Sequence, residues 1–394
     1  MIELAQRPRI RTAGSRVEAA PIAFVRRLDW VLLAAAIALI GYGLWVIAGV
    51  TRFDVPGDES YYVVRQGIAA GIGIAGLVAA AVIPVDLARR NWHLVYGVTL
   101  ALMIVVFVAA ETIRGSKRWI DLGVIQFQPS ELGKVLFVLA IAGFLVDRVG
   151  RVTRWKTIFS AIGLGAAPIL LVFLQPDLGT ALVYAAALFA VLFFVGVRWR
   201  QLVILLAVGA VGIASVLWLL PGAGIQVLKP YQAARLTLDP EADPGGITYN
   251  LNQSITAVGS GGLTGRGVVE ASQTRLDYLP EHATDFAFAS LAEQRGFVGS
   301  AILLLLYLLV VWRGLRVVTV AGDLYGAVVA GGLVFAFLFQ IFVNVGMTMG
   351  VAPVTGIPLP FVTVGGSSMV SNLVLIGVLQ GIHVRGELGG RQSL

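Results

Sequence analysis

The sequence predicts an all-α integral membrane protein with about ten transmembrane helices. Of its 394 residues, 58% are hydrophobic and only 13% are charged, and its mean hydropathy is +0.86. Soluble domains carry roughly 25% charged residues, and a helix needs about 20 apolar residues to cross a bilayer core. The chain has no cysteine, which excludes disulfide bonds and cysteine-ligated metal sites.

Ten apolar runs follow one another along the chain. They lie at about Trp30–Val50, Val63–Ile83, Trp92–Ala110, Leu132–Val146, Ile158–Leu174, Thr180–Val197, Leu202–Leu220, Phe297–Val311, Leu324–Met347 and Val370–His383. Each run is near the length of a membrane-spanning helix. The first run is too long for the apolar region of a signal peptide, so we expect no cleavable signal.

The basic residues favour an orientation with both termini in the cytoplasm. With the N-terminus inside, most of the 29 Lys and Arg residues fall in cytoplasmic segments. The net charge of +7 is then mainly a topology signal, and we do not expect nucleic-acid binding. The chain divides into a basic cytoplasmic segment (1–29), a membrane domain (30–383) and a cytoplasmic tail (384–394).

One long extracytoplasmic loop (221–286) separates the seventh and eighth spans. Loops of this length are uncommon and often functional. Apolar residues repeat in it at spacings of four, four and three, which predicts a helix with one apolar stripe. The stripe consists of Ile247, Leu251, Ile255 and Val258. We expect Asn250, Gln253 and Ser254 to face elsewhere, toward a wet groove.

A cationic stretch precedes the fourth span. Its polar residues are Lys117, Arg118, Asp121, Gln128, Glu131 and Lys134. Arginine binds phosphate oxygens with two parallel N–H groups, so the stretch suits a diphosphate or a lipid headgroup. Glu131 and Lys134 lie three residues apart and share a helix face. Alternatively, these two form a structural ion pair that stabilises the start of the helix.

Two further polar stretches interrupt the apolar pattern. Asp177 lies in a break between the fifth and sixth spans, where it either caps the next helix or contacts a substrate or metal. The glycine-rich run 259–267 lacks the strand and βαβ context of a nucleotide-binding loop. Close approach of the backbone, or a hinge, is the better interpretation of these glycines.

The end of the long loop holds Glu281, His282 and Asp285 just before the eighth span. Thr284 is a candidate N-cap, and Asp285 then complements the helix dipole. Alternatively, Asp285 is a general base, because partial desolvation raises the pKa of an aspartate above about 3.9. His282 is a second candidate base, since the pKa of histidine lies near neutrality.

Taken in order, these motifs resemble the SEDS family of peptidoglycan polymerases, and its RodA branch more than its FtsW branch. The resemblance covers about 30–383. It rests on Arg118-Trp-Ile-Asp-Leu-Gly, Gln128-Pro-Ser-Glu-Leu-Gly-Lys134, Gln175-Pro-Asp-Leu-Gly-Thr180, Gly259-Ser-Gly-Gly, Leu279-Pro-Glu, Thr284-Asp-Phe and Gly356-Ile-Pro-Leu-Pro-Phe361. The chain departs from the family pattern at Ala283, where His is common, at Gln294, and at Thr363-Val364.

The resemblance implies a peptidoglycan glycosyltransferase that polymerises lipid II and releases undecaprenyl diphosphate during cell elongation. It implies that Asp285 deprotonates the acceptor hydroxyl. Lys117, Arg118 and Lys134 would stabilise the leaving diphosphate, together with a divalent cation (Mg²⁺ or Mn²⁺). The expected partners are a class B penicillin-binding protein, which cross-links the strand, and other membrane proteins of the elongation complex.

Two other function classes compete with an enzyme. A lipid II flippase needs a polar route across the whole bilayer, whereas the charges of this chain gather at one face and most spans have apolar middles. A non-catalytic scaffold for the transpeptidase would use the outer loop as a docking surface, with Asp285 as a helix cap. Polymerisation by a purified Asp285 variant separates these hypotheses.

Overall fold

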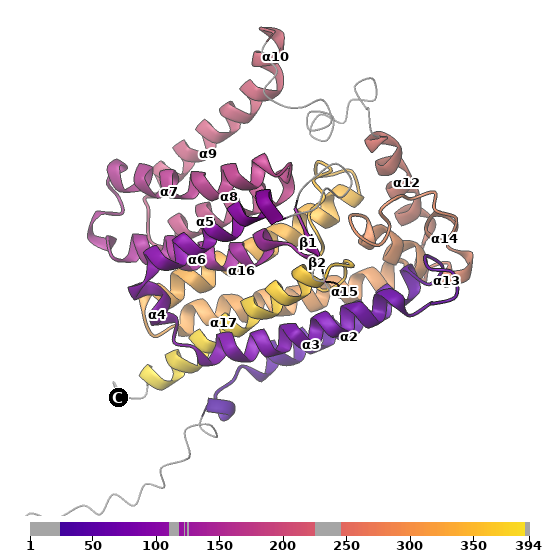
Figure 1. Ribbon diagram of the computed structural model, residues 1–394, viewed down its shortest axis with the longest axis horizontal. Coiled ribbons are helices and arrows are strands. Elements are labelled where there is room, and N and C mark those ends of the chain that lie inside the picture. Colours follow the sequence, from indigo (N-terminus) through magenta and orange to yellow (C-terminus); the bar gives the residue numbers. More distant parts are fainter. Residues whose placement is uncertain (1–23, 110–117, 122, 124–125, 225–245, 391–394) are drawn as a thin grey trace, which may run out of the picture.

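The computed structural model describes residues 24–109, 118–121, 123, 126–224 and 246–390, which are mostly helical (Figure 1). The long helices are α2 (Trp30–Val50), α3 (Tyr61–Val82), α5 (Trp92–Ala109), α6 (Pro129–Val146), α7 (Trp155–Leu174), α8 (Leu178–Phe194), α9 (Trp199–Ala214), α15 (Ala287–Val320), α16 (Leu324–Thr348) and α17 (Gly366–Gly390). The shorter helical elements are α4 (Val85–Arg90), η1 (Val149–Arg151), η2 (Ser215–Leu219), α10 (Leu220–Gly222), α12 (Ile247–Ser260), α13 (Gly267–Glu270) and α14 (Ser272–Arg275).

Each apolar run expected from the sequence overlaps one of the long helices, and the seventh run (Leu202–Leu220) continues past α9 into η2 and α10. Within the described residues, eight helices are long and apolar enough to cross a membrane, and two shorter apolar helices cover Trp92–Val108 and Leu178–Phe194. A multi-pass membrane protein is therefore confirmed. The number of crossings and the orientation of the termini stay predictions.

Two helices run well past the predicted ends of their spans. α15 begins at Ala287 and ends at Val320, and α17 continues to Gly390. The apolar runs used for prediction stop at charged residues, whereas the helices continue through them. In α15 the charged residues Glu293 and Arg313 are buried, so the bundle accommodates both.

A buried ion pair connects three helices at one end of the bundle. The Asp29 carboxylate caps α2 by accepting from the N–H of Leu32, and it accepts from the Arg313 guanidinium of α15 at 2.6–3.1 Å. The Gln380 side chain of α17 bonds to both the N–H and the carbonyl of Asp29. The start of α2 is thus fixed to α15 and α17.

Helices α3 and α17 pack along each other through glycines. A Cβ at Gly73 would lie 2.4 Å from Leu373, and a Cβ at Gly377 would lie 2.3 Å from the carbonyl oxygen of Leu77. Real Cβ atoms do not approach so closely, so only glycine lets these two helices come together. Small residues are a common basis of helix packing in membranes.

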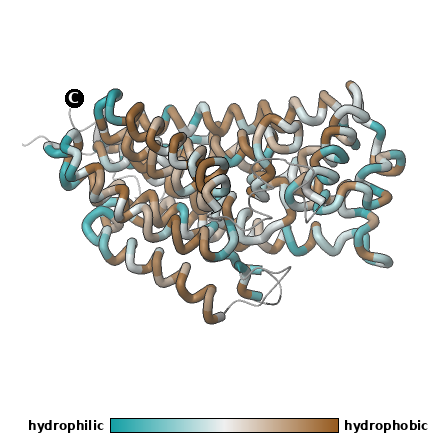
Figure 2. The backbone as a smooth tube through the Cα atoms, turned by 90° about the horizontal axis from the view of Figure 1, so that it is seen from above, coloured by the Kyte–Doolittle hydropathy of each residue, from teal (hydrophilic) through white to brown (hydrophobic). Residues whose placement is uncertain are grey.

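The bundle has two different ends. The first turns of α2 and the last turns of α17 lie near one end, and α12, α13 and α14 lie at the other (Figure 1). Hydrophobic residues line the helices, and hydrophilic residues gather mostly at the ends (Figure 2). α6 and α17 are the most enclosed of the candidate spans, with 89% of the residues in their most apolar windows buried.

One short sheet departs from the predicted all-α fold. Strands β1 (Ile120–Asp121) and β2 (Gln126–Phe127) pair antiparallel, with Asp121 opposite Gln126. Strands of two residues are too short to produce a periodic pattern in the sequence. The Asp121 carboxylate accepts from the N–H of Gly123, whose φ of 82° requires glycine.

The predicted helix in the long loop is confirmed as α12, but its buried face differs from the prediction. Ser254 was expected in a wet groove; it is buried and its hydroxyl donates to the carbonyl of Thr348 in α16. Ile255, expected in the apolar stripe, is 43% exposed. The buried face of α12 instead carries Leu251, Ser254 and Ala257.

Candidate functional site

Asp285 lies in a series of turns (281–286) immediately before α15. The helix begins two residues after Asp285, and its N-cap is Phe286, so the prediction of Thr284 as N-cap is wrong. The Asp285 residue is half-buried, whereas Phe286 is buried in a small apolar cluster with Leu251 of α12 and Leu279 of the loop. This cluster fixes the chain directly beside Asp285.

Hydrogen bonds fix the backbone of this turn from two other elements. Asn344 of α16 donates to the carbonyl of Asp285 at 3.1 Å and to that of Ile357 at 2.7 Å. The Thr363 hydroxyl donates to the carbonyl of Thr284 at 3.0 Å. The N–H of Val364 donates to the carbonyl of Ala283 at 3.0 Å. The position of the Asp285 backbone is therefore set by residues more than 50 positions away.

His282 binds a different part of the chain. Its Nε2 lies 3.0 Å from the Asp54 carboxylate, in the connection between α2 and α3, and its Nδ1 lies 3.4 Å from that of Asp277. Burial alone lowers the pKa of His282, but the hydrogen bond to Asp54 and the charges of Asp54 and Asp277 outweigh it, so the pKa is raised. These contacts give His282 an anchoring role for the loop.

Glu281 shapes the turn before Asp285. Its φ is 57°, in the left-handed region, and its carboxylate accepts from the Thr284 hydroxyl at 2.7 Å. The carbonyl of Glu281 also accepts from the N–H groups of Thr284 and Phe286. Gln253, a further predicted substrate-binding residue, lies on α12 and is half-buried.

A second polar cluster lies where β2 leads into α6. The Asp177 carboxylate accepts from the Gln128 amide at 2.8 Å and lies 3.8 Å from the Arg118 guanidinium. It also accepts from the N–H of Thr180, so the predicted helix cap is confirmed. Within the described residues, the buried Nε of Arg118 has no hydrogen-bond partner. The Arg118 side chain as a whole is 15% exposed.

The connection between α16 and α17 contacts both clusters. On one side, Thr363 and Val364 of the connection bond to the Asp285 turn. Asn344 of α16 bonds both to that turn and to Ile357 of the connection. On the other side, a Cβ at Gly179, next to the Asp177 cap, would lie 2.7 Å from the carbonyl of Thr355. The residues 355–364 therefore position the acidic turn and the Arg118 cluster relative to each other.

Glu131 and Lys134 are buried inside the bundle, each 1% exposed. The Lys134 ammonium donates to Glu131 at 2.8 Å and to Gln340 of α16 at 2.9 Å, and Glu131 accepts from Ser371 of α17. This geometry favours the structural ion pair over contact with a substrate. Asp121, also predicted, supports the turn at Gly123 instead. The predicted residue Lys117 lies outside the described residues.

The glycine-rich run contacts a break in α15. Gly296 has a φ of 65° and interrupts the helix, and the N–H groups of Phe297 and Val298 donate to carbonyls of the run, at Gly262 and Leu263. A Cβ at Gly265 would lie 2.3 Å from the carbonyl of Gln294. The predicted close backbone approach is thus confirmed.

Two residues that support the site, Glu293 and Asn344, were not among the predicted site residues. Glu293 is fully buried, and its carboxylate accepts from the N–H groups of Gln273 and Thr274 and from the Thr274 hydroxyl at 2.7–2.9 Å. Asn344 holds the Asp285 turn. Both are polar residues within or beside apolar runs, a signal that a search restricted to charge clusters overlooks.

The described residues offer no group of three or more His, Cys, Asp or Glu side chains that could hold a metal ion. Asp285 and Asp177 each supply one carboxylate to separate parts of the site. A metal site made of this chain's own ligands does not fit these residues.

Comparisons with known proteins agree with the fold. Residues 28–387 match the family model described as cell cycle protein, FtsW/RodA/SpoVE. The chain is 36% identical over 366 residues to peptidoglycan glycosyltransferase MrdB of Escherichia coli, covering 92% of this chain and 95% of MrdB. It is 34% identical over 361 residues to stage V sporulation protein E of Bacillus subtilis, covering 89% and 95%.

Two solved structures are also similar. A chain of a peptidoglycan synthase complex, in a structure on the coordination of polymerization and crosslinking, superposes with a TM-score of 0.75 at 31% identity. It covers 90% of this chain and 97% of that one. The rod shape determining protein RodA of Thermus thermophilus superposes with a TM-score of 0.65 at 27% identity, covering 90% and 96%. The resemblance noted in the motifs is confirmed, and the chain belongs to the FtsW/RodA/SpoVE family.

Proposed function

We propose that the protein is a peptidoglycan glycosyltransferase that polymerises lipid II and releases undecaprenyl diphosphate, for cell elongation. The relatives named peptidoglycan glycosyltransferase match almost the whole chain, which supports the reaction class. The observation that carries the mechanism is a half-buried carboxylate, Asp285, together with a half-buried arginine, Arg118, whose Nε has no hydrogen-bond partner within the described residues. One connection, 355–364, positions both.

In the proposed reaction, Asp285 accepts the proton of the acceptor sugar's 4-hydroxyl. The freed oxygen then forms a bond to the anomeric carbon of the donor. The bond between that carbon and the diphosphate oxygen breaks, and the electron pair leaves with undecaprenyl diphosphate. Arg118 would bind the leaving phosphate oxygens, because arginine offers two parallel N–H donors to an oxyanion.

The supporting residues then have positioning roles. Asn344, Thr363 and Val364 hold the backbone of the Asp285 turn, and Gln128 holds the Asp177 carboxylate beside Arg118. A base placed by rigid neighbours gains from orientation as well as from its pKa. We propose that Mg²⁺ or Mn²⁺ reaches the site on the diphosphate, whose oxygens supply ligands that the described residues do not.

The proposed partner is a class B penicillin-binding protein, together with other elongation-complex membrane proteins. The similar chain in the peptidoglycan synthase complex supports this pairing. The proposed active site lies on the extracytoplasmic face, at the end of the bundle that holds α12, α13 and α14 (Figure 1).

The test is polymerisation of fluorescent lipid II by the purified Asp285→Asn variant with its transpeptidase partner. We expect loss of glycan strands, and no loss for Glu270→Gln, which removes an exposed carboxylate from the same loop. Wild-type rates from a folded Asp285→Asn protein would refute the general base. Lost polymerisation with retained partner binding excludes a scaffold role for Asp285, and lipid II transport without polymerisation by the wild type would favour a flippase.

A further inference from the structure

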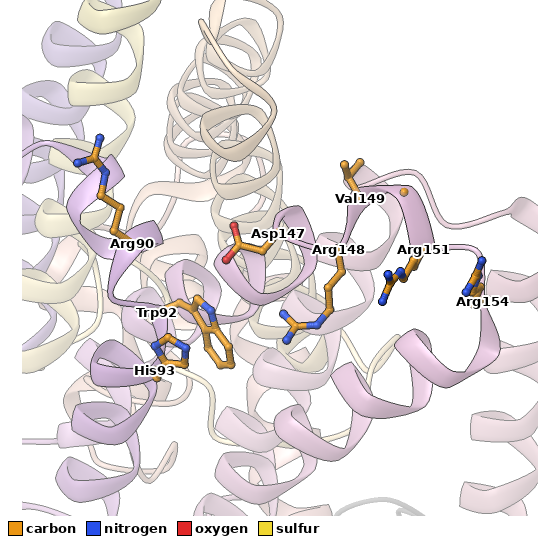
Figure 3. Close-up of a pocket in the computed structure, with 9 residues that line it drawn as sticks. Arg90, Trp92, His93, Asp147, Arg148, Val149, Arg151 and Arg154 are labelled. Carbon is orange, nitrogen blue, oxygen red and sulfur yellow. The ribbon is translucent and has the colours of Figure 1, made fainter.

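Four arginines surround an open cavity far from Asp285 in the fold. The cavity has a volume of about 630 Å³ and lies between α4, the start of α5, and the connection from α6 to α7. Arg90, Arg148, Arg151 and Arg154 line it, together with Trp92 and His93 (Figure 3). Small-molecule sites commonly have volumes of about 300–1,000 Å³.

The cavity carries excess positive charge. Asp147 is the one carboxylate that lines it within the described residues, and that carboxylate lies 3.4 Å from Arg89, which is not among the lining residues. Its charge is therefore shared with a cation outside the cavity. The side chains of Arg148, Arg151 and Arg154 lie in a row along the connection from α6 to α7 (Figure 3), and an anion bound beside them offsets the repulsion between like charges.

One of these arginines is already oriented. The Arg148 guanidinium lies 4.0 Å from the centre of the Phe144 ring and donates to the carbonyl of Phe144 at 2.9 Å. It also lies 5.8 Å from the Trp92 ring, which stacks on His93. Because its position is set by the helix ends, Arg148 loses little freedom when it binds an anion.

The cavity adjoins surface that would contact lipid. It lies where α5 and α7 begin and α6 ends, with a tryptophan at the start of both α5 and α7. Apolar side chains near the starts of these two helices are exposed: Leu94 of α5 is 68% exposed and Phe159 of α7 is 60% exposed. Tryptophan at helix ends marks the interface between headgroups and hydrocarbon. An anionic phospholipid fits such a surface, because its headgroup is charged and its acyl chains are apolar.

We propose that this cavity binds the phosphate headgroup of an anionic phospholipid, with the acyl chains along α5 and α7. Arginine forks suit phosphate oxygens, and basic clusters at helix ends bind anionic headgroups. A free phosphate shares the headgroup chemistry but gains nothing from the apolar surface. The site is separate from the proposed lipid II site and does not depend on that function.

The test uses native mass spectrometry of the full-length protein in detergent with dioleoyl phosphatidylglycerol or dioleoyl phosphatidylcholine. We expect at least tenfold tighter binding of phosphatidylglycerol. Arg151→Gln/Arg154→Gln should weaken it about tenfold, since both residues are exposed and their replacement leaves the packing intact. Arg151→Lys/Arg154→Lys keeps the charge and should recover most of the binding.

The matched control is Arg200→Gln/Arg316→Gln, which removes two exposed cations that do not line the cavity. We expect this control to bind phosphatidylglycerol like the wild type. Equal binding of the two lipids, or an equal loss in the control, would overturn the proposal. Displacement of the lipid by an equal concentration of glycerol 3-phosphate would also overturn it, because the site would then recognise the phosphate alone.

Discussion

Replacing Glu293 by glutamine should release the loop that carries Asp285. The Glu293 Oε1 accepts from the N–H of Gln273, and its Oε2 accepts from the N–H and hydroxyl of Thr274. A glutamine amide has one oxygen, so it can keep the pair of bonds from Thr274 and must turn its NH₂ group toward Gln273. At least one hydrogen bond is lost, and one buried N–H is left without an acceptor.

The expected cost is about 2–3 kcal/mol, because hydrogen bonds to a charged group contribute about 1.5–3 kcal/mol and an unsatisfied buried donor costs about 1–3 kcal/mol. At about 1.4 kcal/mol for each factor of ten, amide exchange near Gln273 and Thr274 should rise roughly 30- to 150-fold, because local opening limits exchange there. Hydrogen exchange with mass spectrometry over 266–286, in lipid nanodiscs, measures it.

The matched control is Glu270→Gln, which changes the same charge at an exposed position of the same loop. We expect exchange in this control to equal that of the wild type. If Glu293→Gln also exchanged at the wild-type rate, the carboxylate would not be the anchor of α14, and the reasoning from these three bonds would fail.

Three further predictions follow from the contacts described. Lys134→Met leaves the Glu131 carboxylate buried without its cation, which should lower the free energy of unfolding by about 3–5 kcal/mol and so lower the thermal midpoint in detergent. The double variant Lys134→Met/Glu131→Leu should recover most of this stability. An unchanged midpoint in the single variant would contradict the prediction. Because the pKa of His282 is raised, its bond to Asp54 is at full strength below about pH 6.5 and weakens as the pH rises through the folded-state pKa. Exchange over 277–285, corrected for intrinsic rates, should therefore rise toward pH 9 in the wild type, and a rise of the same size in His282→Gln would refute the role of this histidine. Polymerisation should stop in EDTA and resume with added Mg²⁺, and a rate that is indifferent to EDTA would exclude a diphosphate-bound cation.

The sequence was sufficient for the long helices, because about 20 consecutive apolar residues have few alternatives to a membrane span. It was less informative at their ends. α15 continues through Glu293 and Arg313, whose charges are balanced by residues far away in the sequence: the α14 backbone for one and Asp29 for the other. No local pattern contains those partners.

Prediction of the site had the same limit. For Asp177 the helix cap was one of two alternatives, and it could be foreseen because a cap is a local feature, with its partner Thr180 three residues away. Lys134 was read as a candidate for binding a substrate, whereas its second partner, Gln340, lies about 200 residues later. Whether a polar residue faces a substrate or the interior is decided by tertiary packing, and in this chain that packing joins distant spans.

The packing of α3 against α17 has a consequence for how the protein is made. The paired residues Gly73 and Leu373 are 300 positions apart, so α3 enters the membrane long before its neighbour exists. At about 5–20 residues per second, synthesis of the intervening chain takes roughly 15–60 s. During that interval the glycine face of α3 contacts lipid or an earlier helix, and the final arrangement of the bundle can form only after the last span has been inserted.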